Sequence, residues 1–279
     1  MMYFLGIFGG VLLLVLLWIF LIAPEKVQTD LFRHPYYAHR GLHSGSAIPE
    51  NTLLAFRKAM DAGFGFEFDI RLTADNRLVV SHDNSLLRVF GVDKKIDECT
   101  YEELLQYRAA DTDEHIPLFS EVLEQMEGKV PLIIEFKNGR NDRLLCELAS
   151  ALLDTYKGDF CVESFHPVIV RWFRRNRPTY IRGQLIGAVE KKSVPIFLSG
   201  LLMHSAVTNA LTRPNFIAYQ QEVAYRRGRP LLFLRVIRKM GAGLVVWTVR
   251  DNETARACLT KPSGIFDVVI FEGFVPESK

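Results

Sequence analysis

HRGLHSGSAIPENTLLAFRKAMDAGFGFEFDIRLTADNRLVVSHD, residues 39–83, is the stretch that decides the fold. Glu67 and Asp69 lie two positions apart within the apolar run 64–70. The histidines His39 and His82 stand at the two ends of the whole stretch, 39–83. A β-strand turns residues i and i+2 to the same face, so both carboxylates would point the same way. Carboxylates on one face of a buried strand repel each other and need a cation or a shared proton. The pattern therefore predicts a site for a hard cation, Ca²⁺ or Mg²⁺, because both ions bind oxygen ligands.

The second half of the stretch predicts a β-hairpin. LTADNRL, residues 72–78, contains Asp75 and Asn76, which suit the central positions of a two-residue turn. With the turn centred there, Asp69 would face His82 across an antiparallel pair. The hairpin would then place a histidine beside the predicted metal carboxylates.

Strand-like apolar runs alternate with amphipathic stretches along the whole chain. The predicted strands are residues 36–39, 65–70, 132–136, 160–165, 181–186, 216–220, 244–249 and 267–271, with a hairpin arm at 78–82. The predicted helices are residues 51–62, 119–127, 142–156, 168–176, 195–211, 230–240 and 252–259. This alternation predicts a parallel sheet, and eight strands favour a closed (β/α)₈ TIM barrel. An open doubly wound sheet is the alternative, but the segment after the first strand is a poor phosphate-binding turn.

Residues 84–117 interrupt the alternation and are predicted to form a small insertion after the second-strand hairpin. The segment contains TYEELLQY, in which Thr100 and Glu103 have the spacing of a capping box at a helix start. An insertion here would lie at the carboxyl ends of the strands, the face on which barrel enzymes carry their chemistry.

The N-terminus predicts a membrane anchor. Residues 3–22 carry no charge and would form a helix about 30 Å long, which matches a bilayer core. A signal peptide is the alternative, but no basic residue precedes the run and LIAPEK is a poor cleavage site. Because Lys26, Arg33 and Arg40 follow it, the barrel of this single-pass cell-membrane protein is expected in the cytoplasm. The expected division is an anchor at 1–23, a linker at 24–35 and a barrel domain at 36–279.

Composition excludes several other classes of protein. The four cysteines form no CxxC pattern, which argues against a zinc knot or a disulfide framework. The formal charge of +2 is too small to imply a nucleic-acid partner.

The chain carries eight short motifs: HRG (39–41), PENT (49–52), EFD (67–69), TADNRLVVSHD (73–83), IPLFSEVLE (116–124), IEFK (134–137), SF (164–165) and WTV (247–249). In this order and spacing they resemble the glycerophosphodiester phosphodiesterase family. The N-terminal span followed by LIAP, with RWFRRNRP and IRGQL, is similar to the membrane-anchored bacterial branch of that family. The resemblance implies a (β/α)₈ barrel that uses Ca²⁺ or Mg²⁺ to hydrolyse glycerophosphodiesters to glycerol 3-phosphate and an alcohol.

The resemblance also implies roles for eight residues of this chain. By their motifs, the metal ligands are Glu67, Asp69 and Glu135; the acid–base pair is His39 and His82; and the substrate contacts are Arg40, Lys137 and Trp247. His39 is favoured as the base and His82 as the acid. Trp247 would stack on the substrate's glycerol, with filling of the barrel as the alternative.

The C-terminus departs from the family pattern. Arg250 follows WTV where most members have Asn, and the last strand reads VVIFEGF instead of carrying a Thr-Asp-Xaa-Pro run. Glu272 is a candidate to replace the lost polar group at the mouth. The departure concerns the substrate more than the chemistry.

Three further segments leave alternatives open. Residues 193–212 are twenty without a charge, either a helix packed on the barrel or an apolar lid that admits a lipid tail. The basic runs at 171–178 and 226–239 are either solvated helix faces or contacts for anionic lipid. The substrate is therefore a small-molecule or lipid phosphodiester. The alternatives are lysophospholipase D or phospholipase C-like action, or a non-catalytic barrel that binds anionic headgroups.

Overall fold

The computed structural model describes residues 2–26, 34–187, 208–226, 229–260 and 264–277. Eight parallel strands form its barrel: β1 (Tyr36–His39), β2 (Gly65–Leu72), β4 (Leu132–Phe136), β5 (Phe160–Ser164), β6 (Arg182–Ile186), β7 (Phe216–Gln220), β10 (Gly243–Val249) and β11 (Val268–Phe271). Neighbours pair in this order, and β1 pairs with both β11 and β2, which closes the sheet. The predicted (β/α)₈ barrel is confirmed, and the open-sheet alternative is wrong.

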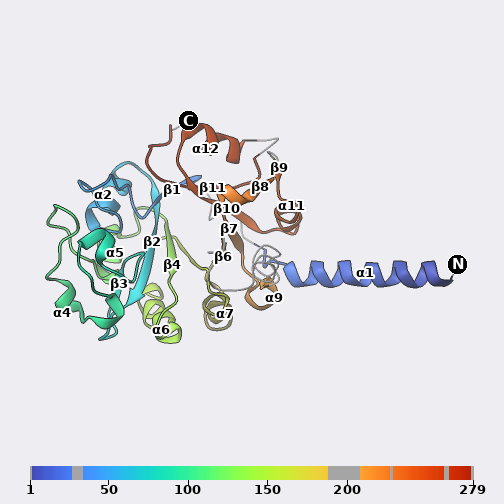
Figure 1. The fold of residues 1–279 in the computed structure, drawn as a ribbon, viewed down its shortest axis with the longest axis horizontal. Coiled ribbons are helices and arrows are strands. Elements are labelled where there is room, and N and C mark those ends of the chain that lie inside the picture. Colours follow the sequence, from blue (N-terminus) through green and yellow to red (C-terminus); the bar gives the residue numbers. More distant parts are fainter. Residues whose placement is uncertain (1, 27–33, 188–207, 227–228, 261–263, 278–279) are drawn as a thin grey trace.

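Helices surround the barrel in the order expected of repeated strand–helix units (Figure 1). They are α2 (Leu53–Asp61), α5 (Phe119–Met126), α6 (Asp142–Leu153), α7 (Pro167–Asn176), α9 (Asn209–Thr212), α10 (Gln221–Ala224), α11 (Leu232–Lys239) and α12 (Asn252–Leu259). The side chains of Thr52, Asn141 and Asp251 each accept a backbone N–H bond at the start of α2, α6 and α12. The short strands β8 (Tyr225–Arg226) and β9 (Arg229–Pro230) pair beside α11. Most of the predicted segment 193–212 lies outside the described residues.

The barrel interior is filled by alternate, inward-facing side chains. Tyr37, Ile133, Leu185 and Val245 belong to this inner cluster. A Cβ at Gly183 would stand 2.2 Å from the ring of Phe216, so β6 leaves the space that this ring occupies. The filled lower barrel makes its carboxyl end the floor of a pocket.

The hairpin has a different register from the predicted one. β3 (Leu78–Val80) pairs antiparallel with β2, with Ile70 opposite Val80, and the N–H of Ser81 donates to the carbonyl of Asp69 at 3.0 Å. The predicted Asp69–His82 pairing is therefore wrong by one residue. The cause is a three-residue loop, closed by the N–H of Thr73 donating to the Arg77 carbonyl. Asn76 occupies the left-handed region of this loop at φ +61°.

Residues 84–117 pack beside the hairpin and contain α3 (Leu87–Phe90), the 3₁₀ turn Ile96–Glu98 and α4 (Tyr101–Leu104). Their apolar side chains form a small cluster of their own with Val79 of β3. The capping box at Thr100 and Glu103 is present: the Thr100 N–H donates to Glu103 Oε2 at 2.7 Å, and the Glu103 N–H donates to Thr100 Oγ1 at 3.3 Å.

The N-terminal helix α1 (Met2–Ile22) projects from the barrel beside α9 (Figure 1). Its last carbonyls are capped by the barrel: Asn209 Nδ2 donates to the Ile22 carbonyl at 2.9 Å, and Arg213 Nη1 donates to those of Phe20 and Ala23 at 2.8 Å. Within the described parts of the chain, no helix reaches the length and apolarity needed to cross a bilayer. The membrane anchor stays a prediction.

Candidate active site

A pocket of about 380 Å³ opens at the carboxyl ends of the barrel strands. Parallel strands deliver their C-terminal residues to one face, where barrel enzymes place their chemistry. The predicted site residues that line it are His39, Arg40, Glu67, His82, Glu135, Lys137 and Trp247. Asp69 lies against Lys137, 1% exposed. The structure therefore brings every predicted side chain together.

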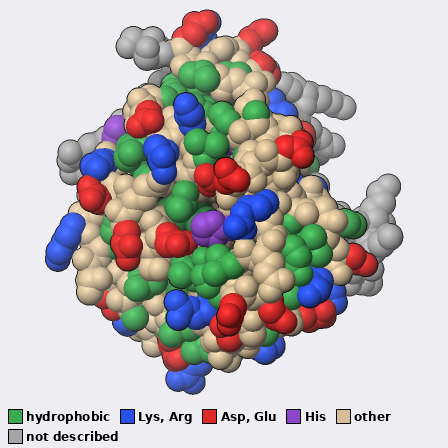
Figure 2. Space-filling view, turned by 90° about the vertical axis from the view of Figure 1, so that its left-hand side faces the viewer, with side chains coloured by type: hydrophobic (Ala, Val, Ile, Leu, Met, Phe, Trp, Pro, Cys, Tyr) green, Lys and Arg blue, Asp and Glu red, His purple; other side chains and the backbone are tan. Residues whose placement is uncertain are grey.

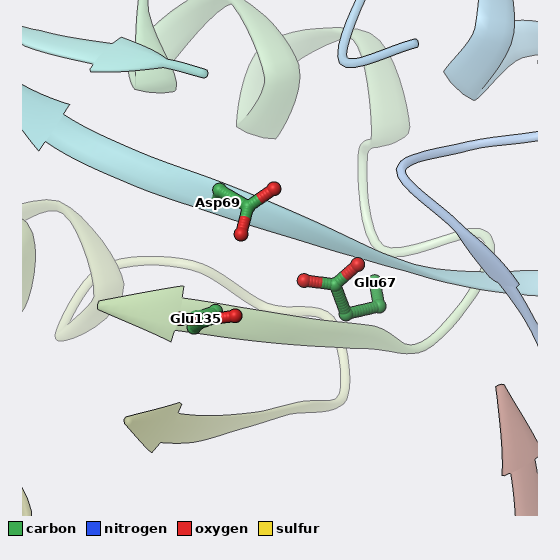
Figure 3. Close-up of side chains that lie close together, drawn as sticks. All are labelled: Glu67, Asp69 and Glu135. Carbon is green, nitrogen blue, oxygen red and sulfur yellow. The ribbon is translucent and has the colours of Figure 1, made fainter. Parts of the chain in front are cut away.

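The three acidic side chains come from two neighbouring strands (Figure 3). Glu67 and Asp69 share one face of β2, and Glu135 on β4 stands in register with Asp69. Each offers an oxygen atom within 4.8 Å of the other two, and all three side chains are buried. Asn51 Nδ2 donates to Asp69 Oδ2 at 2.9 Å and holds this carboxylate in place.

Two basic side chains lie against these carboxylates. Lys137 Nζ is 2.9 Å from Asp69 Oδ1 and 2.7 Å from Glu135 Oε1. The backbone N–H of Arg40 donates to Glu67 Oε2 at 3.2 Å, and its Nε lies 3.8 Å from Asp69 Oδ2. Both cations therefore stand where an anionic ligand would meet them at the cluster.

The turn after β1 depends on Gly41. A Cβ there would stand 2.8 Å from the backbone of Ala55 in α2, and the residue has φ +80°. Arg40 also has positive φ, +54°, and its carbonyl accepts a hydrogen bond from the Asn51 N–H at 3.0 Å. The HRG motif thus folds the strand end tightly onto the start of α2, which aims Arg40 at the carboxylates.

Burial sets the ionisation of the carboxylate cluster. Burial raises the pKa of Glu67 well above its usual range, and the charges of Asp69 and Glu135 raise it further. Burial also raises the pKa of Glu135, to about 7. Although burial acts to raise the pKa of Asp69, the charge of Lys137 opposes it and holds that pKa well below its usual range.

These residues fit a hard divalent cation. The donor set consists only of carboxylate oxygens, which are the ligands that Ca²⁺ and Mg²⁺ prefer. Buried carboxylates that raise one another's pKa are costly to ionise together, and a divalent charge would offset that repulsion.

Each histidine is bonded through Nδ1 to a carboxylate. His39 Nδ1 bonds Glu272, and His82 Nδ1 lies 2.7 Å from Asp83 Oδ1. The hydrogen bond from His39 holds the pKa of Glu272 well below its usual range. Hydrogen bonds from His82 and Arg88 lower that of Asp83 against the effect of burial. Ionised carboxylates only accept hydrogen bonds, so Nδ1 is the donor in both pairs and Nε2 is left to exchange protons.

Burial lowers the pKa of both histidines. For His39 the hydrogen bond to Glu272 opposes this effect, and for His82 the charge of Asp69 opposes it. Nε2 of His39 lies 3.9 Å from Glu67 Oε2, which places this ring beside the carboxylate cluster.

The rim of the pocket carries both signs of charge. Arg88 of the insertion donates to both oxygens of Glu50 at 2.6 and 2.8 Å and to Asp83 Oδ2 at 2.6 Å. Arg250 Nη2 donates to Glu272 Oε1 at 3.4 Å and Nη1 lies 3.8 Å from Glu222. Figure 2 shows the same mixture on one face of the molecule, where acidic and basic side chains surround a histidine near the middle.

Sequence reasoning missed several pocket residues, among them Glu50, Arg88 and Glu163, and named Glu272 without its contact. Glu50 lies inside the PENT motif, which was the signal that could have found it. Arg88 comes from the insertion, where no periodic pattern marks it. Glu163 is a lone carboxylate in the apolar run of β5. Glu272 was named only as a polar group at the mouth, and its bond to His39 is new.

Part of the pocket wall is apolar. Phe165, Leu185 and Trp247 line it, and the rings of Phe165 and Trp247 meet edge to face with centroids 5.5 Å apart. The pocket therefore combines charged and apolar surface in one opening. A closed parallel barrel with such a pocket at its carboxyl end places the chain among the TIM-barrel enzymes.

Comparisons with known proteins identify the family. The model of the "Glycerophosphoryl diester phosphodiesterase family" matches residues 39–266. The chain therefore belongs to this family, and the family and enzyme class predicted from the motifs are confirmed.

Among its relatives, "Putative glycerophosphodiester phosphodiesterase YhdW" of Bacillus subtilis is 29% identical over 239 residues, or 78% of this chain and 87% of that protein. "Uncharacterized protein YqiK" of the same organism is 39% identical over 110 residues, or 37% of this chain and 44% of that protein. Rat "Lysophospholipase D GDPD1" is 34% identical over 150 residues, or 49% of this chain and 46% of that protein. The matches thus span less than half of the last two relatives.

Two solved structures show the same barrel. A phosphodiesterase of Oleispira antarctica, in complex with the product sn-glycerol-3-phosphate, has a TM-score of 0.70 at 21% identity, covering 88% of this chain and 95% of that one. A glycerophosphodiester phosphodiesterase of Thermotoga maritima has a TM-score of 0.61 at 29% identity, covering 85% and 93%.

Proposed function

We propose that this protein hydrolyses glycerophosphodiesters to glycerol 3-phosphate and an alcohol, with a divalent cation, Ca²⁺ or Mg²⁺, and two histidines. The observation that carries the proposal is the pocket itself, which joins three clustered carboxylates to two histidines that each have a carboxylate at Nδ1. Glu67, Asp69 and Glu135 would hold the cation. When bound, the cation would supply positive charge to the phosphate oxygens.

The chain's own cations would orient the substrate. A phosphodiester carries one negative charge, and attack on phosphorus places a second on its oxygens. Arg40 and Lys137, already packed against the cluster, would stabilise that charge where it develops. The apolar wall around Trp247 would keep water from the other side of the substrate.

The two histidines would transfer the protons. One must take a proton from the nucleophile, and the other must give one to the leaving alkoxide. His39 would act as the base through Nε2, because burial lowers its pKa and favours the neutral ring. His82 would act as the acid, since its side chain is 33% exposed against 13% for His39 and is nearer to solvent.

Release of glycerol 3-phosphate from glycerophosphocholine tests the proposal. The full-length protein is assayed with Ca²⁺, with Mg²⁺ and with EDTA, beside Glu135→Gln. We expect release with at least one cation, none with EDTA, and at least a hundredfold loss in the variant because a ligand is removed. Equal release in EDTA would refute the metal requirement, and no release with any cation would refute the reaction.

Lysophospholipase D action is the second candidate, favoured by the similarity to the rat lysophospholipase D. Lysophosphatidylcholine in mixed micelles, offered beside glycerophosphocholine, separates the two activities. A higher kcat/KM for the tailed substrate would move the proposal to the lipid. No detectable hydrolysis of either substrate would favour the non-catalytic barrel that binds anionic headgroups.

The cell-membrane location also belongs to this proposal. Residues 1–23 would anchor the protein, 24–35 would link, and 36–279 would form the barrel domain on the cytoplasmic side. In support, α1 presents apolar side chains such as Phe8 and Leu13, 70% and 66% exposed. Membrane fractions washed with alkaline carbonate should retain the full chain and lose a variant that lacks residues 1–23. Equal release of both would refute the anchor.

A further inference from the structure

Glu163 is a buried carboxylate without a role in the proposed chemistry. It lies on β5 in register with Glu135, is 2% exposed and lines the pocket. Within the described ranges of the chain, no group donates a hydrogen bond to its buried Oε2. Buried polar atoms almost always have a hydrogen-bond partner, because a buried polar atom without one destabilises the protein. The floor of the pocket therefore presents an acceptor that a ligand can satisfy.

This carboxylate stands apart from the cation cluster. Among the described residues, the cluster whose three ligand oxygens all lie within 4.8 Å of one another consists of Glu67, Asp69 and Glu135, and Glu163 is not a member of it. Lys137 pairs with Asp69 and Glu135. On the side away from Glu135, Glu163 stands in register with Gly183 of β6.

The surroundings of Glu163 indicate the kind of ligand. Phe165, Leu185 and Trp247 form the apolar wall beside it, and Nε1 of Trp247 is also buried with no acceptor among the described residues. Among the described residues, the pocket therefore offers an unpartnered acceptor and an unpartnered donor beside apolar side chains. This combination fits a small, neutral fragment with carbon-bound hydroxyl groups, because a hydroxyl both donates and accepts.

We infer that Glu163 is a binding residue for a hydroxyl group of the substrate's glycerol. The inference deepens the proposed function and rests on it. The glycerol half of the diester would lie against β5 and β10, and its phosphate would lie against β2 and β4. The hydroxyl would donate to Glu163, and Trp247 Nε1 would donate to an oxygen of the same fragment.

The ionisation of Glu163 does not decide this contact. Burial raises the pKa of Glu163 well above its usual range, and the charge of Glu135 raises it further. An ionised Glu163 accepts a hydrogen bond from the hydroxyl, and a protonated one also donates to it. The carboxyl group is suited to a hydroxyl in either state.

The inference is tested by isothermal titration calorimetry, which measures how tightly the full-length protein binds two phosphate monoesters in the presence of Ca²⁺. sn-Glycerol 3-phosphate has the hydroxyls, and n-propyl phosphate has the same charge and carbon chain without them. We expect the protein to bind the glycerol compound more tightly. Glu163→Leu should weaken that binding about 10- to 100-fold and leave n-propyl phosphate unchanged, because one hydrogen bond to a carboxylate is removed. Glu163→Gln keeps one acceptor oxygen, so it should weaken the binding of sn-glycerol 3-phosphate less than Glu163→Leu does.

The matched control is Glu135→Gln, the register partner of Glu163. Because Glu135 would hold the cation, this change should weaken the binding of both compounds to the same extent. Three results would overturn the inference. Glu163→Leu could weaken the binding of both compounds equally, or it could weaken neither. The unmodified protein could also bind the two compounds with equal affinity. If Glu163→Leu fails to fold by circular dichroism, the Gln variant decides by the same criteria. Binding is measured without turnover, so failure of the reaction and failure of this contact are separate results.

Discussion

The two histidines of the pocket have similar partners that arise in different ways. His82 bonds Asp83, its neighbour in the chain, and Arg88 donates to Asp83 at 2.6 Å. His39 bonds Glu272, 233 positions away, and Arg250 donates to Glu272 at 3.4 Å. Each histidine thus belongs to a set of three residues, a histidine, a carboxylate and an arginine: His82–Asp83–Arg88 is the local set, and His39–Glu272–Arg250 is the long-range set. The first is built by one short stretch, whereas the second exists only because the barrel closes.

The closure can be followed in the register. Ala38 of β1 stands beside Phe271 of β11, so the next residues along both strands, His39 and Glu272, become neighbours. On its other side His39 stands in register with Glu67 of β2. One histidine is therefore held between the carboxylate cluster and the last strand, and its position depends on the whole sheet.

The largest expected effect comes from removing the rings themselves. His39→Ala and His82→Ala should each lower kcat about 10²- to 10⁴-fold, the usual range for an acid or base in proton transfer. The two should differ with the leaving group. A 4-nitrophenyl ester of glycerol 3-phosphate needs no proton on its leaving group, so it should recover activity in the His82 variant and not in the His39 variant. Recovery in the His39 variant alone would reverse the assignment of base and acid.

The next effect comes from the carboxylates that orient the rings. Asp83→Asn and Glu272→Gln should each lower kcat about 10- to 100-fold with little change in KM, as lost orienting partners do. Because Glu272 is held from a distant strand, Glu272→Asp should recover less activity than Asp83→Glu. Steady-state kinetics on glycerophosphocholine measure both. Full activity in Glu272→Gln would show that closure does not matter to His39.

This contrast also explains what the sequence could and could not predict. Glu67 and Asp69 follow from strand alternation, and Glu135 and Lys137 follow from the IEFK motif of the family resemblance; both signals are local in sequence. The hairpin register was missed by one residue, because nothing in LTADNRL distinguishes a two-residue turn from the three-residue loop observed between Thr73 and Arg77. Glu163 was missed because it has no second carboxylate two positions away. Contacts across the barrel, such as His39–Glu272, require the closed sheet before they can be assigned.

The pH dependence should separate the two pairs more finely. Burial lowers the pKa of both histidines below 6.5, so kcat/KM should be greatest on the acidic side of pH 7. It should rise as His39 loses its proton and fall as His82 loses its own. The hydrogen bonds to Glu272 and Asp83 raise these pKa values, so Glu272→Gln should move the acid limb to lower pH. Asp83→Asn should move the alkaline limb to lower pH. Movement of the opposite limb in either variant would contradict the assignment.

The smallest effect should come from the arginines at the end of each set. Arg250 is 57% exposed and contacts Glu272 at 3.4 Å, and exposed ion pairs contribute about 0–1 kcal/mol. Arg250→Asn, which restores the residue that most of the family carries, should therefore lower kcat less than about fivefold. Arg88→Ala should cost more, because Arg88 joins Asp83 and Glu50 at 2.6 Å and ties the insertion to the rim. If Arg250→Asn lowered kcat more than Arg88→Ala did, the long-range set would depend on its arginine more than the local set does. Closure of β1 on β11 would then not be enough to hold Glu272 against His39.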